Sequence, residues 1–387
     1  MFFLIRRLSV VSTLLGAALL SGCADHAHGV MMPVLADAVP DTSHVEMLVA
    51  TTRAADASPA IMFSGQRGEG VAFADIEVSL PPDRGRKIGE VQWPQALPGN
   101  PATDFVTRKT QHIDRTTALA WVDREAKGSA KRQVLVFVHG FNNKFEDAVY
   151  RFAQIVHDSG SGAVPVLFTW PSKGNVLAYG YDHDSTNYSR TQLETVLRGL
   201  AADPQVGEIS ILAHSMGNWL VLESLRQMAI RDGQVNGKIR NVLMASPDVD
   251  VDVARTQIAD MGPNRPQFSL FVSRDDQALG LSKNLWGDSA RLGAIDPSVE
   301  PYRSQLAAER ITVFDLTSVQ TPVDSVSGAL GHNKFATSPQ IVQLIGTRLS
   351  SGQAITDSRE GLGDQFQGAT GAVSSFGSGL LGRLGGG

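Results

Sequence analysis

Short runs of apolar residues alternate with helix-like patterns through the middle of the chain. A continuous apolar run such as VLVFV suits a strand that is buried on both faces of a sheet. Such runs predict six strands, at 134–138, 164–169, 209–213, 242–245, 268–272 and 311–316. Apolar residues spaced three and four apart predict helices between them, at 145–156, 193–200 and 218–230, and Ser338-Pro339 opens a last one. This alternation predicts an α/β fold: a mainly parallel, twisted sheet with helices on both faces.

The N-terminal part of the chain has a different pattern. Residues 45–52 and 71–80 are strand-like, and the second stretch alternates apolar with small or polar residues. Residues 88–93 are a candidate third strand at an edge, and 94–110, which contain Pro, Gly and Asn, are expected to form a loop. We therefore expect extra N-terminal strands before the α/β pattern begins.

The first residues are typical of a secreted protein. Arg6 and Arg7 precede an apolar stretch over 8–20 that is too short to span a bilayer, which predicts a signal peptide at 1–22. Leu20-Ser21-Gly22-Cys23 resembles the bacterial lipobox, in which the cysteine becomes the acylated first residue. We expect lipidation (palmitate) at Cys23 and attachment to the membrane through this acyl anchor. Because Ala24 follows the cysteine, the resemblance favours the outer membrane, facing the periplasm.

Four segments follow from these patterns. They are a lipoprotein signal at 1–22, a tether at 23–44, an α/β domain at 45–350, and a flexible Gly/Ser-rich tail at 351–387. The tail contains eleven glycines and shows no periodic apolar residues, so it cannot contribute a core.

Composition narrows the function classes. Lys and Arg number 34 against 39 Asp and Glu, and no block of basic residues occurs, so we expect no nucleic-acid partner. The single cysteine excludes an intrachain disulfide framework. HExxH and phosphate-loop motifs are absent, and we expect that no metal or organic cofactor is needed. The sequence indicates no particular protein partner.

The sequence around Ser215 carries the strongest chemical signal. A predicted strand runs into Ala213-His214-Ser215-Met216-Gly217, and a predicted helix follows. A nucleophile elbow needs this strand–turn–helix order, with small residues two before and two after the serine so that the backbones can pass closely. The usual first small residue is glycine, and Ala213 adds one methyl group. We interpret Ser215 as the nucleophile.

A serine nucleophile needs a histidine base and an acid that orients it. In this fold both follow the serine in the order acid, then histidine, and His332 is the only histidine after Ser215. For the acid, Asp276 is favoured because it follows the strand at 268–272; Asp275 and Asp250 remain alternatives.

Two backbone N–H groups are candidates for an oxyanion hole. The strand at 134–138 leads into His139-Gly140-Phe141, which resembles the oxyanion loop of α/β hydrolases, and this resemblance implies that the N–H groups of Phe141 and Met216 hold an oxyanion. We interpret the His139 side chain itself as structural, bonding loop backbone. Four further residues are candidate lining of the substrate pocket: Asn142, Trp170, Tyr181 and Asp182. For Trp170, Tyr181 and Asp182 the alternative is that they form a cap or simply cover the edge of the sheet.

These residues also carry a family resemblance over roughly 45–350. The chain resembles a bacterial α/β-hydrolase family of unknown function, the esterase/lipase superfamily proteins found in envelopes. The matching stretches are Thr51-Thr52-Arg53, Leu135 with the following VFVHGFNN, Trp170-Pro171-Ser172, Tyr181-Asp182, AHSMGN at 213–218, ASPDVD at 245–250, SRDDQAL at 273–279 and Gly331-His332. The resemblance implies an α/β-hydrolase fold, a triad of Ser215, Asp276 and His332, and hydrolase chemistry without a defined substrate.

Two functional hypotheses follow. The first is a serine hydrolase (a carboxylesterase or lipase type) that cleaves a small-molecule or lipid ester through an acyl-enzyme at the bacterial envelope. Amide hydrolysis, thioester hydrolysis and acyl transfer use the same groups. The second is a catalytically idle envelope lipoprotein that uses the fold for binding or scaffolding.

Overall fold

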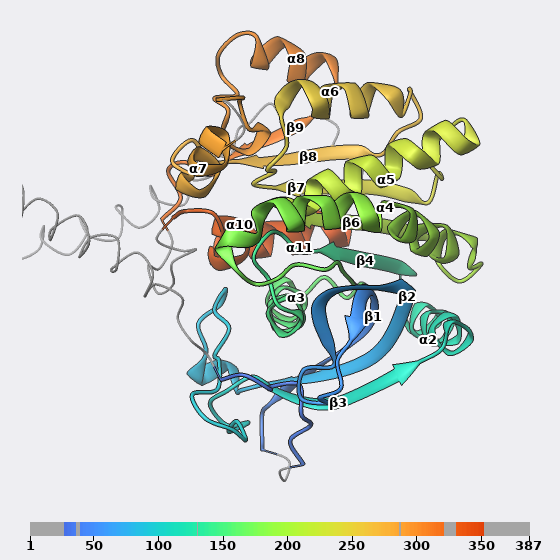
Figure 1. The fold of residues 1–387 in the computed structure, drawn as a ribbon, viewed down its shortest axis with the longest axis vertical. Helices are drawn as coiled ribbons and strands as arrows, with labels where there is room; N and C mark the ends of the chain where they lie inside the picture. Colours follow the sequence, from blue (N-terminus) through green and yellow to red (C-terminus); the bar gives the residue numbers. More distant parts are fainter. Residues whose placement is uncertain (1–26, 36–38, 130, 286–287, 321–329, 352–387) are drawn as a thin grey trace, which may run out of the picture.

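The computed structural model describes residues 27–35, 39–129, 131–285, 288–320 and 330–351, and its centre is a nine-stranded sheet (Figure 1). The strand order is β3-β2-β1-β5-β4-β6-β7-β8-β9. The strands are β1 (Ser43–Ala55), β2 (Phe63–Leu80), β3 (Val106–Ile113), β4 (Gln133–Val138), β5 (Val164–Thr169), β6 (Glu208–His214), β7 (Ile239–Ala245), β8 (Gln267–Val272) and β9 (Thr312–Asp315). In the part of the sheet that runs β1-β5-β4-β6-β7-β8-β9, all neighbouring strands are parallel. β2 pairs antiparallel with both β1 and β3.

Helices cover both faces of the sheet (Figure 1). Their bounds are α2 (Arg115–Gly128), α3 (Phe145–Ser159), α4 (Tyr179–Ala202), α5 (Gly217–Asp232), α6 (Val251–Asp260), α7 (Gln277–Leu285), α8 (Tyr302–Ala308), α10 (Lys334–Thr337) and α11 (Pro339–Ser351), with short 3₁₀ turns η1 (Asp83–Gly85), η2 (Val176–Ala178) and η3 (Leu292–Ala294). Helices α2, α4, α5 and α6 pack in one apolar core, and α3 and α11 pack in a second core on the opposite face. The predicted α/β-hydrolase architecture, a mainly parallel sheet between two helical layers, is confirmed.

The six strands predicted from apolar runs are all present as β4 to β9, and each predicted end lies within three residues of the observed one. Every residue of β4 is buried, as expected for a strand covered on both faces. The predicted helices are also present as α3, α4, α5 and α11, although α4 begins 14 residues earlier than expected, at Tyr179 rather than Leu193. Its first half, YGYDHDSTNYSR, is polar, so apolar periodicity could not reveal it.

The prediction for 88–110 is wrong in two places. Residues 88–93 form turns and irregular structure, and the third strand is β3, which begins inside the expected loop. β3 has the sequence VTRKTQHI and lies at the edge of the sheet, where only its first two residues are buried. An edge strand with polar side chains on both faces lacks the apolar alternation on which the prediction depended.

The segment expected to be a tether is partly packed against the domain. Val30 is 3% exposed and Met31 is fully buried in the core beneath α3. The Val30 carbonyl accepts hydrogen bonds from the hydroxyls of Thr107 and Tyr150. These contacts need only two apolar residues, too few to produce a pattern in the sequence. The predicted signal peptide at 1–22 and Cys23 lie outside the described residues. So does the tail predicted at 351–387, except for Ser351, which ends α11.

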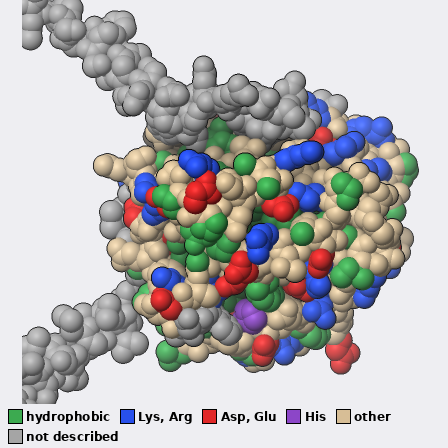
Figure 2. All heavy atoms as spheres, turned by 90° about the horizontal axis from the view of Figure 1, so that it is seen from above, with side chains coloured by type: hydrophobic (Ala, Val, Ile, Leu, Met, Phe, Trp, Pro, Cys, Tyr) green, Lys and Arg blue, Asp and Glu red, His purple; other side chains and the backbone are tan. Residues whose placement is uncertain are grey.

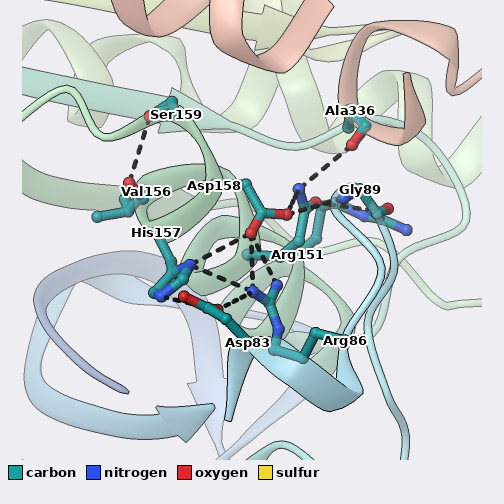
Figure 3. A network of polar contacts seen from close by, with 10 residues as sticks. Asp83, Arg86, Gly89, Arg151, Val156, His157, Asp158, Ser159 and Ala336 are labelled. Carbon is teal, nitrogen blue, oxygen red and sulfur yellow. Dashed lines mark hydrogen bonds and ion pairs between the residues drawn. The ribbon is translucent and has the colours of Figure 1, made fainter. Parts of the chain in front are cut away.

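A buried ion-pair network ties the segment after β2 to α3 (Figure 3). Asp158 Oδ1 lies 2.8 Å from Arg86 Nη2, and both side chains are at most 2% exposed. Asp158 Oδ2 accepts hydrogen bonds from the Gly89 N–H and from Gln154 Nε2, each at 2.8 Å. Gln154 also donates to the carbonyl of Ala336, which connects the network to the C-terminal helices.

Asp158→Ala is expected to lower the free energy of unfolding by about 3–5 kcal/mol, because the buried Arg86 guanidinium would keep only the exposed carboxylate of Asp83 as an ionic partner. Urea unfolding followed by circular dichroism measures this change. The control is Asp123→Ala, which removes an exposed pair with Lys127 and should cost less than about 1 kcal/mol. A similar small effect at Asp158 would contradict the stabilising role of the network.

The same network predicts a stability loss in acid. Burial alone would raise the pKa of Asp158, but hydrogen bonds from His157, the Gly89 N–H and Arg86 outweigh it and lower the pKa to about 2. The unfolded value is about 3.9. The contribution is therefore complete above that value and is lost as the pH falls toward 2. Asp158→Asn should flatten the acid side of the stability curve; an unchanged curve would contradict this.

On the face shown in Figure 2, acidic and basic side chains are interspersed with hydrophobic ones. This arrangement matches the small formal net charge of −5. Within the described ranges, no helix is long and apolar enough to cross a bilayer.

Candidate active site

Ser215 lies on a sharp turn between β6 and α5. Its φ is 52°, a left-handed conformation that costs a non-glycine residue about 1–3 kcal/mol and persists only when its surroundings impose it. The Ser215 N–H donates to the carbonyl of Ala245, and its own carbonyl accepts from the N–H groups of Asn218 and Asp248. Ser215 is thus held outside both the strand and the helix, as a nucleophile elbow requires.

Two glycines allow the chain to pass close to this turn. A Cβ at Gly217 would lie 2.4 Å from the carbonyl oxygen of His139, and one at Gly140 would lie 2.7 Å from the Cβ of Ser215. Ala213, the departure from the usual pattern, is fully buried in β6. The turn after β4 and the elbow after β6 therefore touch at backbone distance.

His332 and Asp276 are in direct contact. His332 Nδ1 lies 2.7 Å from Asp276 Oδ2, and the Asp276 side chain is fully buried. Asp276 Oδ1 accepts from the N–H of Leu279, which fixes the carboxylate at the start of α7. Burial alone would lower the pKa of His332, but the negative charges of Asp276 and Asp248 outweigh it and raise the pKa above 6.5. This is the electrostatic setting of a histidine base whose charged form is stabilised by an acid.

The other two candidate acids, Asp275 and Asp250, have different hydrogen-bond partners. Asp275 forms an ion pair with Lys334, whose Nζ lies 2.8 and 2.9 Å from the two carboxylate oxygens. Asp250 is the N-cap of α6, accepting from the N–H groups of Asp252 and Val253. Among the three candidates, Asp276 alone has a hydrogen bond to His332 in the described structure.

The serine and histidine segments meet through His214. The ring of His214 packs on that of His332 at a centroid distance of 4.8 Å, and its Nε2 lies 3.3 Å from the His332 carbonyl. Burial lowers the pKa of His214 well below 6.5, so the ring is neutral and its N–H donates to that carbonyl. The residue preceding Ser215 thus contacts the histidine that is 118 positions away in the chain.

The turn after β4 presents the Phe141 N–H beside the elbow. His139 Nδ1–H donates to the Gly140 carbonyl, and its Nε2 accepts from the Trp170 N–H. Burial, and then the nearby Arg53 charge, lower the pKa of His139 to about 3. The interpretation of His139 as a structural histidine is confirmed by these bonds. Within the described ranges, neither the Phe141 N–H nor the Met216 N–H donates a hydrogen bond.

Trp170 and Asp182 lie behind this turn and not on an open pocket. Trp170 is fully buried, stacks on His139 at 4.8 Å and donates through Nε1 to the His139 carbonyl. Asp182 is also fully buried and accepts from Ser172 Oγ, the Lys173 N–H and the Asn142 N–H. Since neither side chain reaches solvent, the pocket-lining role expected for them does not fit, and both support the turn instead.

Asn142 and Tyr181 are partly exposed. Asn142 has a left-handed φ of 58° beside Phe141, at the rim of the site. Tyr181 donates from its hydroxyl to the Gly65 carbonyl, and Lys173 Nζ lies 4.4 Å from its ring centroid. Tyr181 therefore contacts the β1–β2 hairpin.

Sequence reasoning assigned no role to two charged residues beside the site. Arg53 lies in the matching stretch Thr51-Thr52-Arg53, is 2% exposed, and donates to the carbonyls of Asn143 and Ser172. Asp248 is 6% exposed and accepts from the hydroxyls of Tyr179 and Ser282, both at 2.6 Å. For Arg53 the signal was its place in a matching motif, and for Asp248 its position directly after β7.

A cavity of about 600 Å³ lies away from these residues. It is open to solvent on one side and lies mainly between β2, α2 and α4, and its lining is largely apolar, including Val71, Phe73 and Val122. Ser215, Asp276 and His332 are not among its lining residues. Within the described ranges there is also no group of three or more His, Cys, Asp or Glu side chains that could hold a metal ion.

A curated relative, "Uncharacterized protein alr1448" of Nostoc sp. (strain PCC 7120 / SAG 25.82 / UTEX 2576), is 27% identical over 213 residues, which are 40% of this chain and 55% of that protein. The chain thus spans about half the length of this relative.

Two solved structures are also similar. A predicted CIB-like hydrolase from Thermoplasma acidophilum has a TM-score of 0.33 and 12% identity, covering 62% of this chain and 91% of that one. An esterase from Pyrobaculum calidifontis has a TM-score of 0.30 and 11% identity, covering 73% and 84%. Similarity at this level is not informative about activity.

A family model described as "Alpha/beta hydrolase of unknown function (DUF900)" matches residues 114–348, more than half of the chain. The matched segment contains β4 to β9 together with Ser215, Asp276 and His332. It follows that this chain belongs to the DUF900 family of α/β hydrolases.

Proposed function

We propose that the protein is a serine hydrolase that cleaves carboxylic esters through an acyl-enzyme. His332 takes the proton of Ser215 as its Oγ attacks the ester carbonyl. His332 then gives that proton to the leaving oxygen as the ester bond breaks, so the alcohol departs and the imidazole is neutral again. The Phe141 and Met216 N–H groups hold the oxyanion, and Asp276 orients the imidazole and stabilises its charged form. Water activated by His332 then releases the acid.

One observation carries this proposal: the buried hydrogen bond between His332 and Asp276 at the carboxyl ends of β8 and β9, beside a strained Ser215 turn. If the contact between His332 and Asp276 only stabilised the fold, the nearby Ser215 would not need a left-handed φ. Strain at one residue together with a raised histidine pKa is typical of an active site.

Stopped-flow hydrolysis of p-nitrophenyl esters of increasing acyl length tests the proposal. An acyl-enzyme predicts a burst that approaches one p-nitrophenol per chain when deacylation is slow, followed by steady turnover. The acyl length with the highest kcat/KM identifies the substrate class. Absence of hydrolysis across short and long esters would favour the alternative, an idle lipoprotein that binds or scaffolds.

The pH profile of kcat/KM is expected to rise through a midpoint above 6.5. His332 must be neutral to accept the proton, and its pKa is raised above 6.5 by Asp276 and Asp248 in spite of its burial. Asp248→Asn should shift this midpoint to lower pH because one of the two stabilising charges is removed. Initial rates between pH 5 and 9 measure both profiles. A midpoint below 6.5 in the unmodified protein would contradict the claim that Asp276 and Asp248 raise the pKa of His332.

We also propose that the enzyme works at the bacterial envelope, anchored through acyl chains on Cys23 and facing the periplasm from the outer membrane. Only the sequence around the lipobox-like motif supports this location. Metabolic labelling with palmitate followed by membrane fractionation tests it. The unmodified protein should carry label in the outer-membrane fraction, and Cys23→Ser should carry none. Label that persists in the variant would contradict the anchor.

A further inference from the structure

Arg53 is a buried cation that joins three segments of the chain beside the candidate active site. It lies in β1, is 2% exposed, and points toward the turns that follow β4 and β5. Nη2 donates to the Asn143 carbonyl at 2.8 Å, and Nη1 donates to the carbonyls of Ser172 at 3.0 Å and Ser64 at 3.3 Å. One side chain thus binds the turn after β4, the turn after β5 and the β1–β2 hairpin.

Arg53 keeps its charge in this environment. Burial lowers its pKa to about 10, and the nearby carboxylates of Glu146 and Asp182 limit this effect. Because the pKa remains far above neutral pH, the guanidinium stays a cation and a donor. Three neutral carbonyls alone would offset little of the free-energy cost of burying this positive charge. The nearby carboxylates supply the remaining electrostatic stabilisation.

Arg53 and Asp182 bind complementary backbone groups of the same two turns. Asp182 accepts from the N–H groups of Asn142 and Lys173, whereas Arg53 donates to the carbonyls of Asn143 and Ser172. The two turns are therefore fixed through both their donors and their acceptors. In the described structure the Phe141 N–H, between these anchored positions and Gly140, donates no hydrogen bond and is available to an oxyanion.

The β1–β2 hairpin that carries Arg53 is itself docked on α4. Thr52 and Ser189 share a hydrogen bond of 2.8 Å, and the Tyr181 hydroxyl donates to the Gly65 carbonyl at 3.1 Å. A Cβ at Gly65 would lie 2.8 Å from the Ser172 carbonyl oxygen, so the hairpin and the turn after β5 touch at backbone distance. The hairpin precedes residue 114, where the match to the family model begins.

We propose that Arg53 is a positioning residue of the active site, which holds the turn 139–143 so that the Phe141 N–H faces the oxyanion, and that the β1–β2 hairpin is therefore part of the catalytic unit. This inference rests on the proposed ester hydrolysis. An oxyanion forms only as the ester carbonyl is attacked, so misplacing its donor lowers kcat and leaves KM nearly unchanged.

Arg53→Met removes the donors and keeps much of the side-chain volume. We expect kcat for a p-nitrophenyl ester to fall about 10–100-fold with KM within about twofold, because small misplacements of a catalytic donor have effects of this size. Arg53→Lys keeps the charge but loses the forked geometry, and should restore part of kcat. Arg86→Met is the control, since Arg86 is also an arginine with a buried guanidinium outside the family match, but its hydrogen bonds go to Asp158 and not to 139–143.

A second readout does not depend on catalysis. Amide hydrogen exchange in peptides that cover 139–143 should speed up in Arg53→Met and stay unchanged in Arg86→Met, with both variants at a temperature where they are fully folded. Unchanged exchange in the turn, or an unchanged kcat in an active enzyme, would overturn the positioning role. Faster exchange in a protein that hydrolyses no ester would refute the proposed function and leave the structural role of Arg53 standing.

Discussion

Ser215→Ala is expected to lower kcat for ester hydrolysis by about 10⁴-fold or more, because no other group can form the acyl-enzyme. The residual rate would come from the oxyanion hole and from substrate binding. Steady-state kinetics with the preferred p-nitrophenyl ester measure the change, and the pre-steady-state burst should disappear as well.

Stability gives the necessary control for this variant. Alanine removes only Oγ, and the backbone bonds of residue 215 to Ala245, Asn218 and Asp248 remain. The melting temperature should therefore stay close to that of the unmodified protein, since alanine keeps the Cβ and with it the left-handed strain at this position. Undiminished turnover by a folded Ser215→Ala protein would show that the nucleophile lies elsewhere.

Asp276→Asn is expected to lower kcat by about 10⁴-fold, the second largest effect. An amide in place of the carboxylate cannot stabilise the His332 imidazolium, and it can hold the ring in the wrong tautomer. Kinetics across pH give a further sign of the same change. The pKa of His332 should fall once the Asp276 charge is removed, so the remaining activity should persist to lower pH.

The neighbouring aspartate provides a matched control. Asp275→Asn has the same chemistry one position away, but Asp275 binds Lys334 and Ser273 and not His332. Its effect on kcat should be less than about tenfold, acting only through the Lys334 anchor of the His332 segment. Equal losses from both variants would contradict the assignment of Asp276 as the orienting acid.

The central sheet was predictable because its strands are buried on both faces. A strand such as β4 must be apolar at every position, and such a run is visible in a single sequence. β3 lies at the edge of the sheet and the first half of α4 carries polar side chains. Neither element therefore contains an apolar run or an apolar periodicity that the sequence could reveal. Elements that are apolar because they are buried on both faces can therefore be inferred from a single sequence. Polar elements whose position depends on contacts with neighbouring parts of the fold cannot.

The site shows the same division. The order of motifs along the chain was enough to expect His332 and Asp276 at neighbouring strand ends, and the structure places them in hydrogen-bond contact. The contacts of Trp170 and Asp182 depend on how the turns after β4 and β5 pack against each other and against α4, so the sequence could not decide between pocket lining and a structural role for these two residues. Arg53 was recognisable as part of a motif, but its role requires the three carbonyls that meet only in the folded chain.

Covalent labelling with a fluorophosphonate tests the central claim most directly, since this probe reacts with a serine only when a base and an oxyanion hole activate it. The intact protein should gain the mass of one phosphonyl group, and peptide mapping should place it on Ser215. Asp276→Asn should react far more slowly, and Ser215→Ala should not react. A folded protein that takes up no label, or takes it up at another serine, would contradict the assignment of Ser215 as an activated nucleophile.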